Sequence, residues 1–320
     1  MKKGVPQGSL TGPLLFNIFL NDLLLCLENE CTVYNYADDN SLSYSHMNPL
    51  VLKSSLEKAS NTAIVWFKEN LMKVNPNKFQ GIVIAPNKRI NVKLEFHLNG
   101  GVMIKPSDND KLLGVRLDSK LNFSVHIKDI LSKCAKQINV LARLSKLLSA
   151  ECKMKMLNAF VMSNLNYCST LYHFCHMDDA IKLEKLQKRA LRYVLNDYVS
   201  PYQELLSVSK KDPLYMCRTR SILENVFKIS HGLLPPMEPS FFMQGNHEYE
   251  LRRSNTFTRP RPRTTHFGLN SLKNYGSKLW NDIPNNLRNI EDYRVFQKML
   301  SSWNNICHCN TCRECRLLNV

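Results

Sequence analysis

The chain opens on a loop-forming stretch, Gly4-Val5-Pro6-Gln7-Gly8-Ser9-Leu10-Thr11-Gly12-Pro13, on which the interpretation of the following residues depends. Three glycines and two prolines within ten residues disfavour regular structure, because glycine loosens the backbone and proline fixes φ and lacks an N–H donor. Pro13 suits the first turn of a helix, and the apolar residues after it recur with helical spacing. The stretch therefore predicts a shaped loop that leads into a helix. Such a loop can approach a phosphate or nucleotide, although a tight turn before a core helix explains it equally well.

Two adjacent carboxylates follow at the expected tip of a β-hairpin. Residues 32–37 carry a strand pattern of β-branched and aromatic side chains, and a second strand pattern begins at Ser41. Asp38 and Asp39 fall between the two patterns. Asp-Asp-Asn is common turn chemistry, but clustered carboxylates also hold Mg²⁺ for two-metal phosphoryl transfer. The pattern by itself leaves both interpretations open.

Together, the loop and the hairpin resemble motifs B and C of the reverse transcriptases of non-LTR (LINE-like) retrotransposons. The segments that carry the resemblance are Val5-Pro6-Gln7-Gly8-Ser9, Gly12-Pro13-Leu14-Leu15-Phe16, Asn21-Asp22 and Tyr36-Ala37-Asp38-Asp39. It implies RNA-templated DNA synthesis, with an RNA template, a DNA primer and dNTPs as partners and Mg²⁺ as cofactor. The residues that it places near nucleotide and template are Gln7, Gly8, Ser9 and Tyr36. It assigns Asp38 and Asp39 to catalysis as metal ligands.

The same resemblance predicts a gap in the active site. In that family another catalytic aspartate lies on a strand upstream of the Val-Pro-Gln-Gly loop, and this chain begins three residues before Gly4. We therefore expect an amino-terminally truncated fragment that lacks this aspartate and the fingers region and is inactive or nearly so by itself. The alternative is a catalytically dead relic that still binds nucleic acid.

The composition agrees with a protein that contacts nucleic acid. The 320 residues carry a net charge of +16, as expected for a surface that neutralises phosphates. A basic surface could also bind membranes or acidic proteins. Neither a signal peptide nor a transmembrane segment is evident, so no membrane partner is expected. Eleven cysteines, odd in number and mostly scattered, indicate a reducing compartment. The sequence thus predicts an intracellular protein, with nucleus and cytoplasm both open.

The residues after the hairpin predict further parts of a polymerase palm. A helix is expected from Asn48-Pro49 to about Leu71, and a strand from Lys78 to Ile84. By the resemblance Lys78 is a candidate general acid of motif D, with a solvated lysine as the alternative. Strict alternation over residues 90–98 predicts another strand, which places His97 on the polar face.

Residues 111–118 resemble the motif E region that supports the primer end. Within it the resemblance assigns primer support to Leu113 and Gly114. The glycine allows a close approach of the backbone, but a plain strand with a bulge fits the same residues.

A helical region with a basic face is expected from about His126. Apolar residues at helical spacing predict helices from His126, over 152–165 and around Leu183 to Val194. The third helix is basic on its other side, which could be only a solvated face. In a thumb domain the cations expected on the nucleic-acid backbone are Lys185, Lys188, Arg189 and Arg192.

The last 85 residues form a basic extension in the sequence. Arg259, Arg261 and Arg263 alternate with prolines, which predicts an extended segment suited either to phosphates or to a plain solvated loop. A cysteine-rich tail follows, and its candidate Zn²⁺ ligands are Cys307, Cys309, Cys312 and Cys315. The spacing does not fit a retroviral zinc knuckle, so a reactive cysteine-rich tail remains the alternative.

The fold class expected from these patterns is α+β. A partial palm, an antiparallel sheet plus helices, should occupy residues 1–120. A mainly helical thumb should follow over 121–235, and the carboxyl-terminal extension over 236–320.

Overall fold

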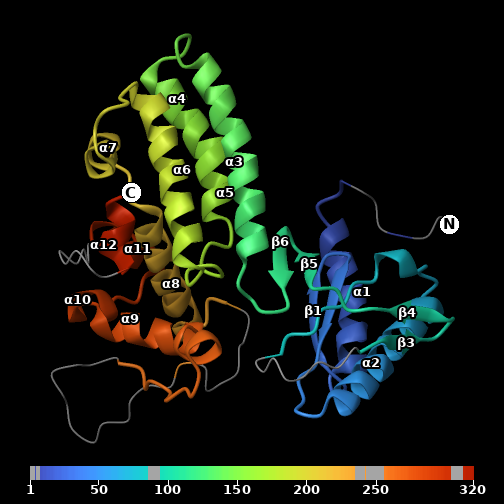
Figure 1. Cartoon of the computed structure of the whole chain (residues 1–320). Helices are drawn as coiled ribbons and strands as arrows, with labels where there is room; N and C mark the ends of the chain where they lie inside the picture. Colours follow the sequence, from blue (N-terminus) through green and yellow to red (C-terminus); the bar gives the residue numbers. More distant parts are fainter. Residues whose placement is uncertain (1–3, 5–7, 86–93, 235–241, 243–255, 304–312) are drawn as a thin grey trace, which may run out of the picture. The chain divides into compact units, whose positions relative to one another are not determined.

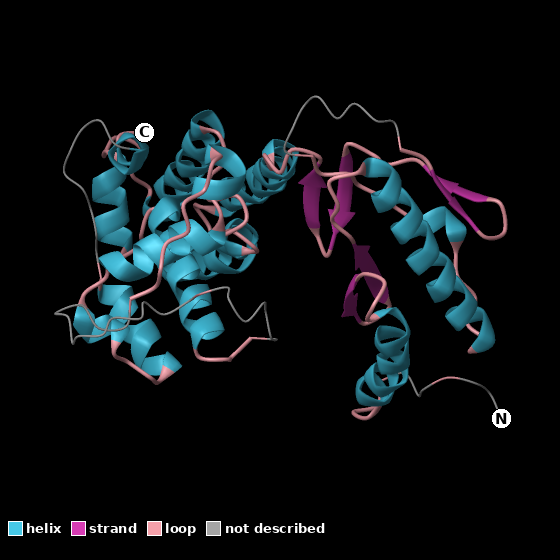
Figure 2. Cartoon of the chain, turned by 90° about the horizontal axis from the view of Figure 1, so that it is seen from below, coloured by secondary structure: helices cyan, strands magenta, loops and turns pink. Residues whose placement is uncertain are grey.

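The computed structural model describes residue 4, residues 8–85 and 94–234, residue 242, and residues 256–303 and 313–320. The chain divides into two compact units (Figure 1). The amino-terminal unit comprises residues 1–112 and 118–120, and the helical unit comprises residues 113–117 and 121–320. Helices and short antiparallel strands are both present, which confirms the expected α+β class. Figure 2 shows the strands in magenta, and within the described residues all of them precede α3.

A hairpin packed on two helices forms the core of the amino-terminal unit. Its elements are α1 (Gly12–Leu27), β1 (Thr32–Tyr36), β2 (Asp39–Ser43) and α2 (Pro49–Glu69). Asn48 caps α2, since its side chain accepts a hydrogen bond from the Leu50 amide at 2.9 Å. Val33 and Leu42 pack against buried residues that the two helices share, namely Leu20, Leu23, Leu27, Ala59, Ala63 and Trp66. One face of the hairpin is therefore covered by helices.

The predicted strand from Lys78 to Ile84 is wrong. Residues 76–78 form a short 3-10 helix, η1 (Pro76–Lys78), and residues 79–85 form no strand. The Gly81 carbonyl accepts a hydrogen bond from the Ser107 amide, but no strand ladder pairs with this segment within the described residues. A strand requires a neighbouring strand as well as a suitable pattern, and none is paired here.

Four further strands agree with the sequence in part. β3 (Phe96–Leu98) and β4 (Val102–Ile104) pair antiparallel, and His97 is exposed as expected, whereas residues 86–93 lie outside the described part of the chain. Instead of one strand with a bulge, residues 109–118 form two strands, β5 (Asn109–Leu112) and β6 (Val115–Asp118). Leu113 and Gly114 between them both have positive φ, 45° and 85°. Two consecutive residues of this kind form a tight turn.

Two long helices, α3 (Ser124–Leu144) and α6 (Met177–Leu195), and two short ones, α4 (Ala150–Met156) and α5 (Ser163–Asn166), contribute to the first core of the helical unit. The helix expected over 152–165 is interrupted by a π-helical segment, η2 (Leu157–Met162). α3 and α6 pack against each other through buried aliphatic residues such as Ile138, Leu183 and Ala190. This core confirms the helical spacing of the sequence.

The remaining helices extend the first core and form a second one. They are α7 (Tyr202–Ser209), α8 (Leu214–Ser230), α9 (Ser277–Asp282), α10 (Asn285–Arg288), α11 (Tyr293–Ser302) and α12 (Arg313–Leu318), with π-helical turns η3 (Thr265–Leu269) and η4 (Leu272–Gly276). The start of α8 contributes to the first core and its second half to an aromatic second core around Phe227, Trp280 and Phe296. α12 returns to the first core through Leu317. None of the helices in the described residues is long and apolar enough to cross a bilayer.

A buried carboxylate joins α6 to the start of α8. Glu184 is fully buried and accepts hydrogen bonds from the amides of Leu214 and Tyr215 at 3.0 and 2.9 Å. The Tyr202 hydroxyl lies 2.7 Å from the same carboxyl group, and the Arg218 guanidinium lies 3.8 Å from it. Burial raises the pKa of Glu184, against the opposing effects of Arg218 and these hydrogen bonds. The carboxyl group thus satisfies amide donors that the first turn of α8 leaves open.

Candidate functional site

The carboxylate pair lies at a tight hairpin tip. Tyr36 pairs with Asp39, so the turn consists of Ala37 and Asp38 alone. Ala37 has φ of 52°, the sign that the first central residue of a type II′ turn adopts and that glycine normally supplies. The side-chain amide of Asn40 donates to the Asp38 carbonyl at 3.3 Å. The tip is therefore short and fixed by its own backbone, and Asp38 is exposed at its end.

The two faces of the hairpin differ in chemistry. Tyr34, Tyr36 and Asp39 lie on the outer face, where the tyrosines are 62% and 67% exposed. On the inner face, the paired Asn35 and Asn40 follow Val33 and Leu42 towards the tip. Both asparagines have buried amide atoms without a partner among the described residues. The outer face, in contrast, presents aromatic rings beside carboxylates.

The carboxylates of Asp38 and Asp39 suit a hard divalent cation. Mg²⁺ prefers oxygen ligands, and both side chains are exposed and without an ion-pair partner among the described residues. Within those residues no third histidine, cysteine, aspartate or glutamate joins them in a group that could hold a metal. The two carboxylates by themselves therefore offer only part of the ligand set that a metal ion needs.

The glycine-rich loop is described only from Gly8 onward, apart from Gly4. Gly8 has φ of 81°, which a side chain would disfavour, and the Ser9 hydroxyl accepts a hydrogen bond from the Gly12 amide at 3.0 Å. Ser9 thus fixes the entry into α1, the helix that packs beneath the hairpin. Gln7 lies outside the described residues, so its predicted role is not addressed by the structure.

Lys78 is exposed at the end of η1. Among the described residues, no hydrogen bond or ion pair connects its side chain to the hairpin tip. Its assignment as a general acid stays a prediction.

Tyr167 contacts the turn for which the sequence predicts primer support, and no sequence pattern revealed this contact. Its hydroxyl donates to the Leu113 carbonyl at 2.6 Å, and a Cβ added to Gly114 would lie 3.5 Å from its ring. The tight turn of Leu113 and Gly114 is therefore held by a side chain 54 positions later in the chain. No local pattern signals such a long-range contact.

The basic helix is α6, and some of its cations already bind other parts of the chain, whereas others do not. Lys188 donates to the carbonyl of Val320 at 2.7 Å, and its pKa is lowered by partial burial and by Arg192 and Lys185. Arg189 donates to the Asn139 side chain at 2.6 Å. Lys185 is exposed, and Arg192 is half-buried. The four predicted phosphate contacts therefore share one helix, but two of them already hold other parts of the chain.

The arginine segment and the cysteine tail are described unequally. Arg259, Arg261 and Arg263 are exposed in a segment without helix or strand, as the prolines predict. Arg259 also donates to the Asn274 side chain at 3.4 Å. Cys307, Cys309 and Cys312 lie outside the described residues, and Cys315 is buried in α12. The zinc site accordingly stays a prediction.

Comparisons with known proteins match this architecture to one family. Residues 1–117 match the family described as reverse transcriptase (RNA-dependent DNA polymerase). Over 147 residues the chain is 31% identical to a probable RNA-directed DNA polymerase from transposon BS of Drosophila melanogaster, covering 44% of this chain and 16% of that protein. Over 201 residues it is 28% identical to the RNA-directed DNA polymerase from mobile element jockey of the same species, covering 60% of this chain and 22% of the relative.

A further relative comes from the wasp Nasonia vitripennis. It is a Pol polyprotein from the type-1 retrotransposable element R1, 22% identical over 204 residues, which are 60% of this chain and 48% of the relative. The chain thus spans about a fifth of the two Drosophila proteins and about half of this one. No solved structure matches the chain.

Proposed function

We propose that the β1–β2 hairpin supplies catalytic carboxylates for RNA-templated DNA synthesis, because residues 1–117 match the reverse transcriptase family and the chain is similar to RNA-directed DNA polymerases of mobile elements. In that reaction the 3′-OH of a primer attacks the α-phosphate of a dNTP, and pyrophosphate leaves. The observation that carries the proposal is the register of the hairpin. It places Asp38 at an exposed tip and Asp39 beside Tyr36 on the outer face.

Asp38 and Asp39 would hold Mg²⁺, whose chemistry is to offset the negative charge that develops on the transferred phosphoryl group. The hairpin itself would hold the two carboxylates in position. Its inner face is anchored on α1 and α2, and its two-residue turn leaves the carboxylates little freedom. We expect a further carboxylate of the polymerase to complete the site, since the pair alone offers few ligands for two ions.

Tyr36 and Gly8 would serve the substrates. An exposed tyrosine ring next to the carboxylates can stack on a base or sugar, and stacking tolerates any sequence. Gly8, with its positive φ and no side chain, permits backbone to approach a nucleotide closely. Gln7 and Ser9 keep the roles that the family resemblance assigns to them.

The helical unit would bind the backbone of the primer–template duplex through α6. Lys182, Lys185, Arg189 and Arg192 recur at three- and four-residue intervals, which puts them on one stripe of the helix. Phosphate contacts of this kind give affinity without sequence choice. The match to the jockey polymerase covers 60% of the chain, so it extends beyond the family region and supports a polymerase origin for these helices.

Photo-crosslinking from the primer end tests the proposal on this chain. A DNA primer that ends in 4-thiothymidine, annealed to an RNA template, should crosslink on irradiation to the peptide that contains Tyr34 and Tyr36. Tyr36→Leu should lower the yield at this peptide severalfold, whereas Tyr198→Leu, which removes a ring 55% exposed on the helical unit, should not. Crosslinks found only outside residues 32–43 would count against the proposal.

A further inference from the structure

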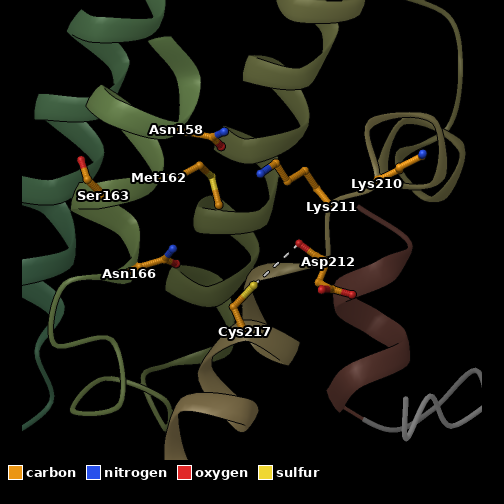
Figure 3. Close-up of a pocket in the computed structure, with 8 residues that line it drawn as sticks. All are labelled: Asn158, Met162, Ser163, Asn166, Lys210, Lys211, Asp212 and Cys217. Atoms are coloured by element: carbon orange, nitrogen blue, oxygen red, sulfur yellow. Dashed lines mark hydrogen bonds between the residues drawn. The ribbon is translucent and has the colours of Figure 1, made fainter. Parts of the chain in front are cut away.

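A polar cavity of about 370 Å³ lies within the helical unit, away from the residues assigned to polymerisation. One wall comes from η2 and α5 and the other from the segment that joins α7 to α8 (Figure 3). Its volume is within the range of pockets that bind small organic molecules. It is therefore larger than a single ion needs.

Three hydrogen-bond donors converge on this space. Figure 3 shows the Lys211 ammonium reaching towards the Asn158 amide, with the Asn166 amide directed into the same space. In the part of the chain that the structure describes, none of these three side chains has a hydrogen-bond or ion-pair partner; Asn158 and Asn166 are exposed, and Lys211 is half-buried. A lysine and two amides without partners form a donor set suited to an anion with several oxygens.

The acidic residue of the cavity does not cancel this charge. Asp212 forms an ion pair with Arg220. In Figure 3 its carboxylate is directed away from Lys211. The Asp212 carbonyl, which faces the cavity side, is bound by the buried Gln187 amide at 3.0 Å. The cavity therefore keeps an unneutralised cation on a fixed segment of backbone.

The local backbone is unusual at both walls. The π-helical turns of η2 carry Asn158 and Met162 at the cavity, and π-helical insertions frequently occur at functional sites. On the other wall, Lys210 has φ of 53° where α7 ends, and the Lys211 amide donates to the Leu206 carbonyl at 3.0 Å. This helix end directs the side chains of two consecutive lysines oppositely, Lys211 inward and Lys210 outward.

We propose that this cavity binds a phosphate group, with Lys211 as the charged contact and Asn158 and Asn166 as neutral donors. The phosphate can belong to a nucleic-acid strand or to a small phosphorylated molecule, since either presents the same oxygens. The site is independent of the hairpin carboxylates, so it can fail without affecting the polymerase proposal.

Binding of inorganic phosphate, of thymidine 3′,5′-diphosphate and of a twelve-residue oligothymidylate tests the site on the full chain by calorimetry at constant ionic strength. Lys211→Met removes the charge and keeps the stem. It should weaken binding of at least one of these probes by about tenfold or more, as expected for a lost charge-assisted hydrogen bond. Lys210→Met is the matched control: Lys210 also lines the cavity, but in Figure 3 its side chain runs away from the space that Lys211 enters, so binding should stay within about twofold.

The probes also distinguish the source of the phosphate. An effect of Lys211→Met on the oligothymidylate alone assigns the cavity to a nucleic-acid strand, and an effect on the two small probes assigns it to a phosphorylated small molecule. Asn158→Leu should reproduce the selective loss, and thermal unfolding verifies that each variant is folded. Equal effects of Lys211→Met and Lys210→Met on every probe, or no effect of either, would overturn the proposal.

Discussion

At the hairpin tip, one alanine adopts the conformation that turns the carboxylates outward. Ala37 has φ of 52°, a region that costs an L-residue about 1–2 kcal/mol. Such strain at an exposed turn beside two aspartates suggests that the tip is kept for its chemistry. The sequence could place Asp38 and Asp39 at this tip, because strand patterns flank them on both sides. It could not give the sign of φ at Ala37.

Ala37→Gly should therefore stabilise the amino-terminal unit. Loss of the Cβ relieves the strain, and this exceeds the added flexibility of glycine, so the free energy of unfolding should rise by up to about 1 kcal/mol. Urea unfolding measures it. Ala63→Gly, the same change inside α2, should instead lower the unfolding free energy. Equal losses in both variants would show that the turn is not strained.

His173 should make the helical unit sensitive to acid. Burial, together with the guanidinium groups of Arg218 and Arg313, lowers the pKa of His173 to about 3, whereas an unfolded histidine titrates near 6.5. Because the folded-state pKa is the lower one, the stability is fully present above about pH 6.5 and is lost as the pH falls towards 3. The loss should reach about 2 kcal/mol between pH 7 and pH 5.

Urea unfolding at these two pH values measures the effect. His173→Phe keeps a ring against Phe174 and Tyr275 and should remove this part of the pH dependence. His176→Gln, at an exposed position three residues later, should leave the dependence unchanged. If His173→Phe and the original chain lose the same free energy on acidification, the histidine is not buried neutral.

Contacts between residues that lie far apart in the chain could not be predicted from the sequence. The hydrogen bond from the Tyr167 hydroxyl to the Leu113 carbonyl joins positions 54 residues apart. The hydrogen bond from the Leu214 amide at the start of α8 to the Glu184 carboxylate joins positions 30 residues apart. Neither leaves a periodic signal, since each depends on tertiary packing. Residue types and motif spacing predict the candidate catalytic groups, but they do not predict these long-range contacts.

Among the elements, α6 combines a buried face with a cationic stripe. The helix and its basic side were predictable from the spacing of apolar and charged residues. Its two bound cations were not: Lys188 holds the carbonyl of Val320, and Arg189 holds Asn139 on α3. Lys185 and Arg192 are thus the pair to test for phosphate binding.

The double variant Lys185→Ala, Arg192→Ala should weaken binding to an RNA–DNA hybrid by about tenfold or more and reduce the slope of log K against log[salt] by about 2. The matched control is Lys58→Ala, Lys155→Ala. It removes the same charge from lysines that are ion-paired with Glu30 and Glu151. Fluorescence anisotropy over a salt series measures both. If the control variant binds the hybrid as weakly as the test variant does, the affinity depends only on the net charge of the protein.

α12 belongs to the core of the helical unit, although its sequence is that of a short tail. Leu317 is 1% exposed, and the helix packs on α6. Leu317→Ala should lower the free energy of unfolding by about 2–4 kcal/mol, because it leaves a cavity in a packed core. Leu147→Ala, at a position 80% exposed, should change it by less than about 0.5 kcal/mol. Similar small effects in both would place α12 outside the core.

Elements that depend on a partner strand were the least predictable. The helices of both units appeared where apolar spacing indicated them, since an amphipathic helix carries its own hydrogen bonds. Residues 78–84 had a strand-like composition and formed no strand, because no ladder pairs with them in the described structure. Composition favours a strand, but pairing decides it.

For the whole molecule, the fold class and the family were accessible from sequence because they depend on local motifs and composition. The loop from Gly4 to Pro13 and the Tyr36–Asp39 tip indicated the reverse transcriptase family, which the match over residues 1–117 confirms. The expected domain boundaries near residues 120 and 235 stay a prediction, and the return of α12 to the first core left no signal in the sequence. Both depend on long-range packing.

The central claim is that Asp38 and Asp39 are the catalytic carboxylates of an RNA-directed DNA polymerase, and primer extension on an RNA template tests it most directly. The longest open reading frame that contains this chain should be assayed with Mg²⁺ and dNTPs. Asp38→Asn, which keeps the size of the side chain and removes its charge, should lower the rate by about a hundredfold or more. Asp178→Asn, an exposed carboxylate on α6, should stay within about twofold. Primer extension that is equally fast in Asp38→Asn and in the unaltered protein would contradict the account.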